Sequence, residues 1–150
     1  MIRLSAKAVI AGLLTDLIGG IAVGLILAST FIYICSLSGD MSQAHYLALK
    51  SNIYSESIGF AGTTFFTGLG GYVAGKLGPN GDKMKNALVV GVISTLIGIS
   101  ITIALPGLVP TWKVILGVSL TIPAALIGGR LATWPQRQNL QNSPGSDAPT

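Results

Sequence analysis

The chain has 150 residues, of which 50% are hydrophobic and only 9% are charged, with a formal net charge of +4. Its mean hydropathy is +0.69. Because a soluble domain has about 25% charged residues, this composition excludes an ordinary soluble globular protein and predicts an integral membrane protein. The basic excess is explained by topology below, so it does not indicate nucleic-acid binding.

Four apolar segments follow one another along the chain. They cover approximately residues 8–34, 58–75, 87–105 and 114–131. A helix needs roughly 20 residues to cross about 30 Å of hydrocarbon, so each segment predicts one membrane-spanning helix. We expect an all-α membrane protein, with a four-helix transmembrane domain over residues 1–134.

The first segment could also be the apolar part of a cleavable signal peptide, since Arg3 and Lys7 precede it. It is longer than the roughly 7–15 apolar residues of such a peptide, and it contains a carboxylate, Asp16. We therefore expect a retained helix.

The basic residues sort by loop. Lys50 and Lys113 are the two that fall between the first and second or the third and fourth predicted spans. The other seven lie before the first span, between the second and third, or after the fourth: Arg3, Lys7, Lys76, Lys83, Lys85, Arg130 and Arg137. The positive-inside rule then predicts that the N- and C-termini are cytoplasmic.

Two tryptophans, Trp112 and Trp134, bracket the fourth predicted span. About 22 positions separate them, or ~33 Å along a helix. This separation is close to the hydrocarbon thickness, so we expect both rings to act as anchors at the two membrane interfaces.

Two regions lie outside the predicted spans. Residues 36–57 form the outer loop, in which Asp40 and Gln43 have the spacing of a helix cap, and the second helix is expected to begin near Met41. Residues 135–150 are polar, rich in Pro, Ser and Asn, and without apolar periodicity, which is typical of a disordered tail.

An internal similarity suggests two repeats. Residues 12–19, GLLTDLIG, align with residues 91–98, GVISTLIG, and the second and fourth spans both end in two glycines before a basic residue. The first and third spans enter the membrane from the same side, so we expect two helical hairpins arranged as parallel repeats, as in some transporters. Chance similarity between two glycine-rich helices is the alternative.

The chain contains 20 glycines, many of them spaced to lie on one face of a helix. Small residues four apart let membrane helices approach closely. The glycines expected to serve this packing are Gly12, Gly19, Gly20, Gly24, Gly71, Gly75, Gly98, Gly128 and Gly129.

Asp16 lies about nine residues past Lys7, ~13 Å into the membrane, on the same helical face as the glycines. Counting about the same number of residues into each of the other spans, from the basic residue that flanks it, reaches a hydroxyl side chain on every helix. The sequence therefore predicts an intramembrane polar layer that consists of Asp16, Thr67, Ser94, Thr95 and Thr121. An acid inside the membrane either serves a proton or substrate path or joins helices through hydrogen bonds, and both alternatives remain open.

Other candidate chemical groups stand alone. Glu56 falls at the outer interface, where it can pair with Lys50 or Lys113. Cys35 and His45 are the only residues of their kinds, so neither a metal site nor a catalytic triad is expected. We predict no enzyme activity and no cofactor.

Three stretches carry a resemblance to known proteins. They are Lys7-Ala8-Val9 leading to Gly12 and Asp16, GGYVAGKLGP over residues 70–79, and NALVVGVI over residues 86–93. With these motifs the chain resembles a broad group of small four-span bacterial membrane proteins of unassigned function. The resemblance implies a location in the bacterial inner membrane.

Two functions are compatible with these features. The first is a structural or accessory membrane protein that assembles through glycine-mediated helix packing, as a homo-oligomer or with other membrane-protein subunits in the lipid bilayer. The alternative is a small proton-coupled transporter or channel that uses Asp16 and the polar layer.

Overall fold

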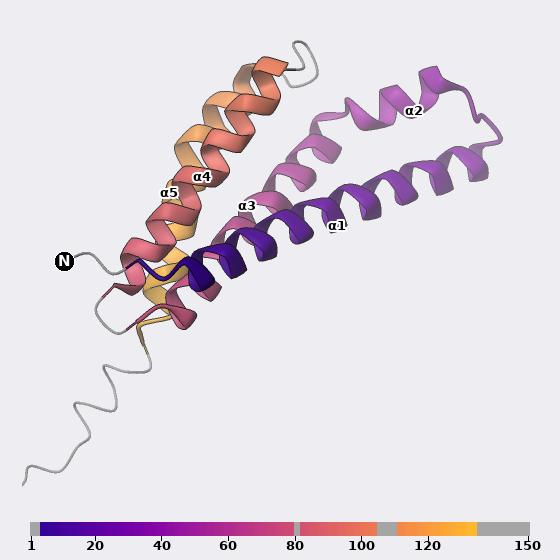
Figure 1. Ribbon diagram of the computed structural model, residues 1–150. Helices are drawn as coiled ribbons and strands as arrows, with labels where there is room; N and C mark the ends of the chain where they lie inside the picture. Colours follow the sequence, from indigo (N-terminus) through magenta and orange to yellow (C-terminus); the bar gives the residue numbers. More distant parts are fainter. Residues whose placement is uncertain (1–3, 80–81, 105–110, 135–150) are drawn as a thin grey trace, which may run out of the picture.

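A computed structural model describes residues 4–79, 82–104 and 111–134, and this part of the chain contains five helices and no strand. The helices are α1 (Ala6–Ser38), α2 (Gln43–Lys50), α3 (Ile53–Leu77), α4 (Lys83–Ala104) and α5 (Thr111–Leu131) (Figure 1). The all-helical prediction is therefore confirmed for the described residues. The tail predicted over residues 135–150 lies outside them.

Three of these helices are long and apolar enough to cross a membrane: Ala6–Ser38, Lys83–Ala104 and Trp112–Leu131. This supports an integral membrane protein. The second predicted span corresponds to α3, which has 25 residues but is not among the three. Its glycines and threonines lower its mean hydropathy, and its place in the fold explains this composition, because α3 packs against α1, α4 and α5.

The outer loop differs from its prediction. A separate helix, α2, precedes α3, and Ser42 rather than Asp40 caps it, since the Ser42 hydroxyl accepts from the backbone N–H of His45 at 3.2 Å. Asp40 instead accepts from the backbone N–H of Ser42 at 2.9 Å, which forms a turn just before the helix. The next helix begins at Ile53, where the Asn52 side chain caps it. The predicted helix start near Met41 therefore applies to α2, not to α3.

The described helix ends lie at two ends of the molecule (Figure 1). One end, which we call the basic end, contains the start of α1, the end of α3, the start of α4 and the end of α5. The backbone N–H of Ser5 donates to Asn86 Oδ1 there at 3.2 Å. The opposite end, which we call the α2 end, contains Lys50 and Lys113. The described basic residues thus separate spatially as the loops predicted, and Trp112 and Trp134 lie at opposite ends of α5.

Close packing of α1 with α3 and α4 is found near the basic end. A Cβ placed at Gly12 of α1 would lie 2.6 Å from Gly70 O of α3 and 2.9 Å from both Ala74 Cβ and Val90 Cγ2. Val9, Ala74 and Val90 form a buried cluster beside this crossing. Toward the α2 end, α4 and α5 diverge as a pair from α1 (Figure 1).

Glycine also brings α5 against its neighbours. A Cβ at Gly71 would overlap the carbonyl oxygen of Ala125, and one at Gly128 would overlap that of Gly68. A Cβ at Gly129 would lie 2.5 Å from Ala87 Cβ of α4. No side chain larger than hydrogen fits these positions without moving a helix.

The remaining predicted packing glycines divide into two groups. A Cβ at Gly19 would overlap the Phe66 ring, and one at Gly75 would lie 3.1 Å from Ala132 Cβ. At Gly20, Gly24 and Gly98, by contrast, a Cβ would meet nothing within 4 Å among the described residues. Within one chain these three glycines therefore leave open space beside their helices, and their packing against another helix stays a prediction.

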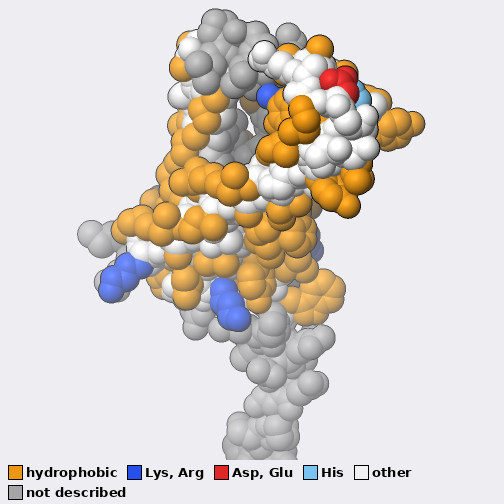
Figure 2. Space-filling model, turned by 90° about the vertical axis from the view of Figure 1, so that its right-hand side faces the viewer, with side chains coloured by type: hydrophobic (Ala, Val, Ile, Leu, Met, Phe, Trp, Pro, Cys, Tyr) orange, Lys and Arg blue, Asp and Glu red, His pale blue; other side chains and the backbone are white. Residues whose placement is uncertain are grey.

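The described surface is largely apolar, as lipid contact requires. Hydrophobic side chains cover most of the face in Figure 2, and the acidic and histidine side chains visible there lie together at its upper end. Large side chains such as Leu25, Ile26 and Leu37 are more than 60% exposed. In water such a surface would drive association, whereas in a bilayer it faces the acyl chains.

Candidate functional site

Asp16 lies on α1 one helical turn beyond the crossing at Gly12. A Cβ at Gly70 would lie 3.2 Å from Asp16 Cβ, so the absence of a side chain at Gly70 leaves room for the acid. The glycine face of α1 therefore places Asp16 toward α3 and α4. This is the orientation that the i, i+4 spacing from Gly12 predicts.

Two hydroxyls from two other helices donate to this acid. Thr67 Oγ1 of α3 donates to Asp16 Oδ1 at 2.8 Å, and Ser94 Oγ of α4 donates to Asp16 Oδ2 at 2.5 Å. The first distance is typical of a hydroxyl hydrogen bond, and the second lies at the short end of the range. Each carboxylate oxygen thus has a donor, and three helices are joined through one side chain.

Thr67 has a second acceptor within reach. Its hydroxyl lies 3.2 Å from the carbonyl oxygen of Thr63, one turn earlier in α3. A threonine hydroxyl carries one proton, so Thr67 can donate to Asp16 or to Thr63 but not fully to both. The hydroxyl can therefore accept from position 16 if the group there becomes a donor.

The other two members of the predicted polar layer do not join the cluster. Thr95 Oγ1 donates to Gly91 O at 2.8 Å, and Thr121 Oγ1 donates to Gly117 O at 2.6 Å, each within its own helix. Such bonds satisfy a hydroxyl without linking helices. Counting positions along the chain gave the depth of these residues but not the direction of their side chains.

Three cavities adjoin the cluster or lead toward it. One of about 390 Å³ lies between α4 and α5 and is lined by Thr63, Ser94 and Lys113. Another of about 210 Å³ is lined by Asp16 and Ser94. The third, of about 470 Å³, shares Thr63 and Lys113 with the first. Ser94 and Thr63 thus belong both to the hydrogen bonds of the Asp16 cluster and to the lining of cavities that extend toward the α2 end.

An ion pair closes the α2 end of α3 and α5. Lys113 Nζ lies 3.2 Å from Glu56 Oε1, with the two side chains 23% and 15% exposed. Lys50 and Lys113 were both expected as possible partners of Glu56, and the ion pair forms with Lys113. Lys113 Nζ also lies 5.6 Å from the centre of the Trp112 ring.

The outer turn holds an exposed acid. The hydroxyl and backbone N–H of Ser42 both bond to Asp40 and lower the pKa of its carboxyl below the usual value. His45 Nε2 lies 3.4 Å from Ser38 Oγ, and Cys35 is buried in α1. No group of three His, Cys, Asp or Glu side chains that could hold a metal occurs in the part of the chain that the structure describes.

Asn86 is a buried polar residue that the sequence analysis missed. Its side chain is fully buried, and its Oδ1 accepts from Ser5, which fixes the start of α1 against α4. Within the described residues its Nδ2 has no hydrogen-bond partner. The only signal in the sequence was an amide at the start of an apolar run, which is also typical of an exposed helix end.

Comparison with known proteins gives no relative: no family model, no curated protein and no solved structure matches the chain.

Proposed function

We propose that the chain is a four-span membrane protein with a structural or accessory role, in which Asp16 fixes the relative positions of α1, α3 and α4. The observation that carries this proposal is that both Asp16 oxygens accept from hydroxyls on other helices. Hydrogen bonds between membrane helices stabilise a bundle by about 0.6 kcal/mol each, with larger values in favourable cases. Close glycine packing beside Asp16 supplies the dispersion contacts that such an assembly also needs.

The structural role is tested by two substitutions at one position. Asp16→Asn keeps an oxygen that can accept from Ser94, and its amide can donate to Thr67, which then donates to Thr63. Asp16→Ala loses both interhelical bonds. We expect the free energy of unfolding of Asp16→Asn to lie within about 0.5 kcal/mol of that of the parent. That of Asp16→Ala should be lower by about 1–3 kcal/mol. Equal stability of Asp16→Ala and the parent in detergent would show that the bonds hold nothing together.

The accessory part of the role is tested by purification. We expect a second copy or another membrane protein to co-purify with the full chain in mild detergent, and a substitution such as Gly71→Leu, which would displace α5, to release it. Retention of the same partner by Gly71→Leu would contradict assembly through this packing. A chain that is monomeric and without a partner in the bilayer would contradict the accessory role.

The topology that this role requires has four spans and both termini on the cytoplasmic side, in the bacterial inner membrane. Support comes from the common basic end and from α3, whose 25 residues are about 37 Å long as a helix. This topology is tested by labelling with a membrane-impermeant maleimide. The two proteins labelled each carry Cys35→Ser and one new cysteine, either Ser51→Cys or Lys85→Cys. We expect labelling from opposite sides, and labelling of both from one side would show that α3 does not cross.

The two hairpins, α1 with α3 and α4 with α5, are proposed as the parallel repeats. Gly12 and Gly91, which align in the repeat, both allow a close approach to another helix. Their partners differ, because Gly12 meets Gly70 whereas Gly91 meets Ala125 and Ile122. If the hairpins are repeats, they have diverged in how their two helices pack.

A second candidate function is proton-coupled transport or conduction. The observation that favours it is that Ser94 borders both the Asp16 cavity and the cavity that extends to Lys113. A proton path would then run through Ser94 to Asp16. In liposomes, Asp16→Asn should abolish pH-dependent flux while the protein stays folded, whereas flux equal to that of the parent would eliminate this candidate.

A further inference from the structure

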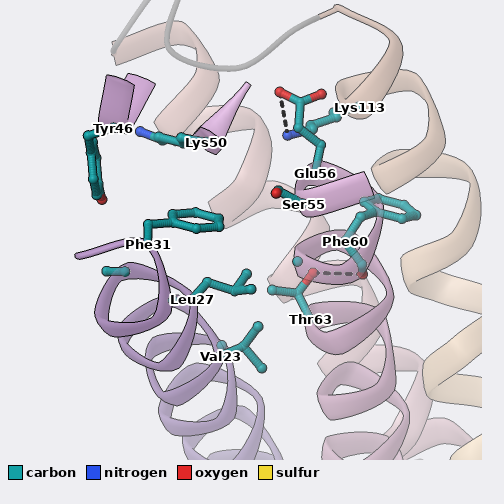
Figure 3. Close-up of a pocket in the computed structure, with 14 residues that line it drawn as sticks. Val23, Leu27, Phe31, Tyr46, Lys50, Ser55, Glu56, Phe60, Thr63 and Lys113 are labelled. Atoms are coloured by element: carbon teal, nitrogen blue, oxygen red, sulfur yellow. Dashed lines mark hydrogen bonds and ion pairs between the residues drawn. The ribbon is translucent and has the colours of Figure 1, made fainter. Parts of the chain in front are cut away.

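The cavity of about 470 Å³ at the α2 end lies between α1, α2 and α3 (Figure 3). Its lower part is apolar and includes Val23, Leu27 and Phe60. Its upper part carries Lys50 and the Lys113–Glu56 pair, which Figure 3 shows above the aliphatic side chains. The volume falls in the range of about 300–1,000 Å³ found for small-molecule sites.

The charge at the upper part is unbalanced. Two ammonium groups, those of Lys50 and Lys113, border the cavity with one carboxylate, that of Glu56. Glu56 pairs with Lys113, and Lys50 makes no ion pair with any residue in the described part of the chain. Glu56 and Lys113 lie in the first turns of α3 and α5, so both helix starts are at this end of the cavity. The free backbone N–H groups of a first turn contribute positive partial charge. Lys113 opposes the dipole of its own helix, so a further anion would stabilise this end.

The floor of the cavity is kept open by glycine. A Cβ at Gly24 would meet nothing within 4 Å among the described residues, whereas the glycines near the basic end are in tight contact. The exposed side chains next to it on α1, such as Ile21 and Leu25, are apolar. Ile21 and Leu25 directly follow Gly20 and Gly24, which line the cavity, so an exposed apolar surface of α1 lies next to it.

We propose that this cavity binds an anionic membrane lipid, with its phosphate near Lys50 and Lys113 and part of one acyl chain between α1 and α3. The anion matches the excess positive charge, and the apolar lining matches a chain. The surrounding bilayer supplies the ligand directly through the open apolar side. This binding site is independent of the structural role proposed for Asp16.

Tryptophan fluorescence provides the test. The chain has two tryptophans, and Trp134→Phe leaves Trp112, which adjoins Lys113, as the only reporter. The protein is reconstituted in vesicles that contain either phosphatidylglycerol or phosphatidylcholine brominated on the acyl chains. We expect quenching of Trp112 by the anionic bromolipid to saturate at a lower mole fraction than quenching by the zwitterionic one.

Two substitutions with matched controls locate the site. Lys50→Gln should weaken the preference for the anionic lipid about five-fold, whereas Lys7→Gln, at the basic end, should leave it unchanged. Gly24→Leu should remove the preference because its side chain fills the cavity. Gly117→Leu, which enters the neighbouring cavity between α4 and α5, should retain it.

Several outcomes would overturn the proposal. Equal quenching by the two bromolipids in the parent would exclude charge selection. An unchanged preference in both Lys50→Gln and Gly24→Leu would exclude this cavity. A third outcome would assign the cavity to a soluble ligand instead. In it, a water-soluble ten-carbon carboxylate protects Trp112 from quenching in a saturable way, and the vesicle lipids quench it without any preference.

Discussion

Substitution of Gly12 by alanine tests the tight crossing at the basic end. The new Cβ would lie 2.6 Å from Gly70 O and 2.9 Å from Val90 Cγ2. Ordinary contacts are about 3.4–4 Å, so α1 must move by roughly 0.8 Å from α3 while α4 blocks its other side. Such overpacking costs about 1–3 kcal/mol.

The same movement reaches Asp16, one turn away. If the whole movement lies along its bond from Thr67, that bond would lengthen from 2.8 Å to about 3.6 Å, beyond the usual hydrogen-bond range. Loss of this bond increases the destabilisation by about 0.6 kcal/mol. The higher helix propensity of alanine reduces it by up to about 1 kcal/mol. We therefore expect Gly12→Ala to lower the free energy of unfolding by about 2 kcal/mol.

Gly20→Ala is the matched control, since it makes the same change on the same helix where a Cβ meets nothing within 4 Å among the described residues. We expect it to be as stable as the parent or up to about 1 kcal/mol more stable. The assay is SDS-induced unfolding in mixed micelles, followed by circular dichroism. If the free energies of unfolding of the two variants differ by less than about 0.5 kcal/mol, the close crossing does not exist in the folded protein.

Three further predictions concern the other helices. Gly128→Ala should lower the free energy of unfolding by about 1–3 kcal/mol because its Cβ would overlap a backbone oxygen of α3. Gly117→Ala, also on α5 but in open space among the described residues, should not lower it. Equal unfolding midpoints of the two variants would contradict this prediction. A double-mutant cycle with Glu56→Gln and Lys113→Gln should give a coupling energy of about 0.5–1.5 kcal/mol for the partly buried pair, and a value near zero would show that the pair is not formed. The pKa of Asp40 is lowered in the folded chain, so the stability that it contributes to the turn before α2 is complete above about pH 4. That contribution is lost as the pH falls through the lowered pKa. Amide chemical shifts of α2 should follow this titration in the parent and not in Asp40→Asn.

The sequence predicted the helical class and the direction of Asp16 because both follow from periodicity. The depth count identified Thr67 and Ser94 as neighbours of Asp16, but it also included Thr95, which lies at the same depth and bonds within its own helix. One position along a helix turns a side chain by about 100°, so depth without orientation cannot separate adjacent residues. Orientation depends on how the helices cross, and that is set by contacts between residues far apart in the chain.

The packing glycines show the same limit. Gly12 and Gly20 both lie on the glycine face of α1, yet a Cβ at Gly12 would meet α3 and α4, whereas one at Gly20 would meet nothing within 4 Å among the described residues. Close approach depends on where two helices cross, and a spacing pattern repeats all along a helix. The cap of α2 was missed for a different reason, because Asp40 and Ser42 are both good cap residues and only the backbone geometry decides between them.

The unequal lengths of α1 and α5 link the protein to the thickness of its membrane. The apolar part of α1, residues 8–34, is about 40 Å long, whereas the 21 residues of α5 extend about 32 Å. A bilayer core of about 30 Å accommodates α5 almost upright, but α1 must tilt to keep its apolar length covered. Tilting one helix and not the other widens the angle between the hairpins. A thicker bilayer should therefore bring them together, and the shape of the α2 end should respond to lipid chain length.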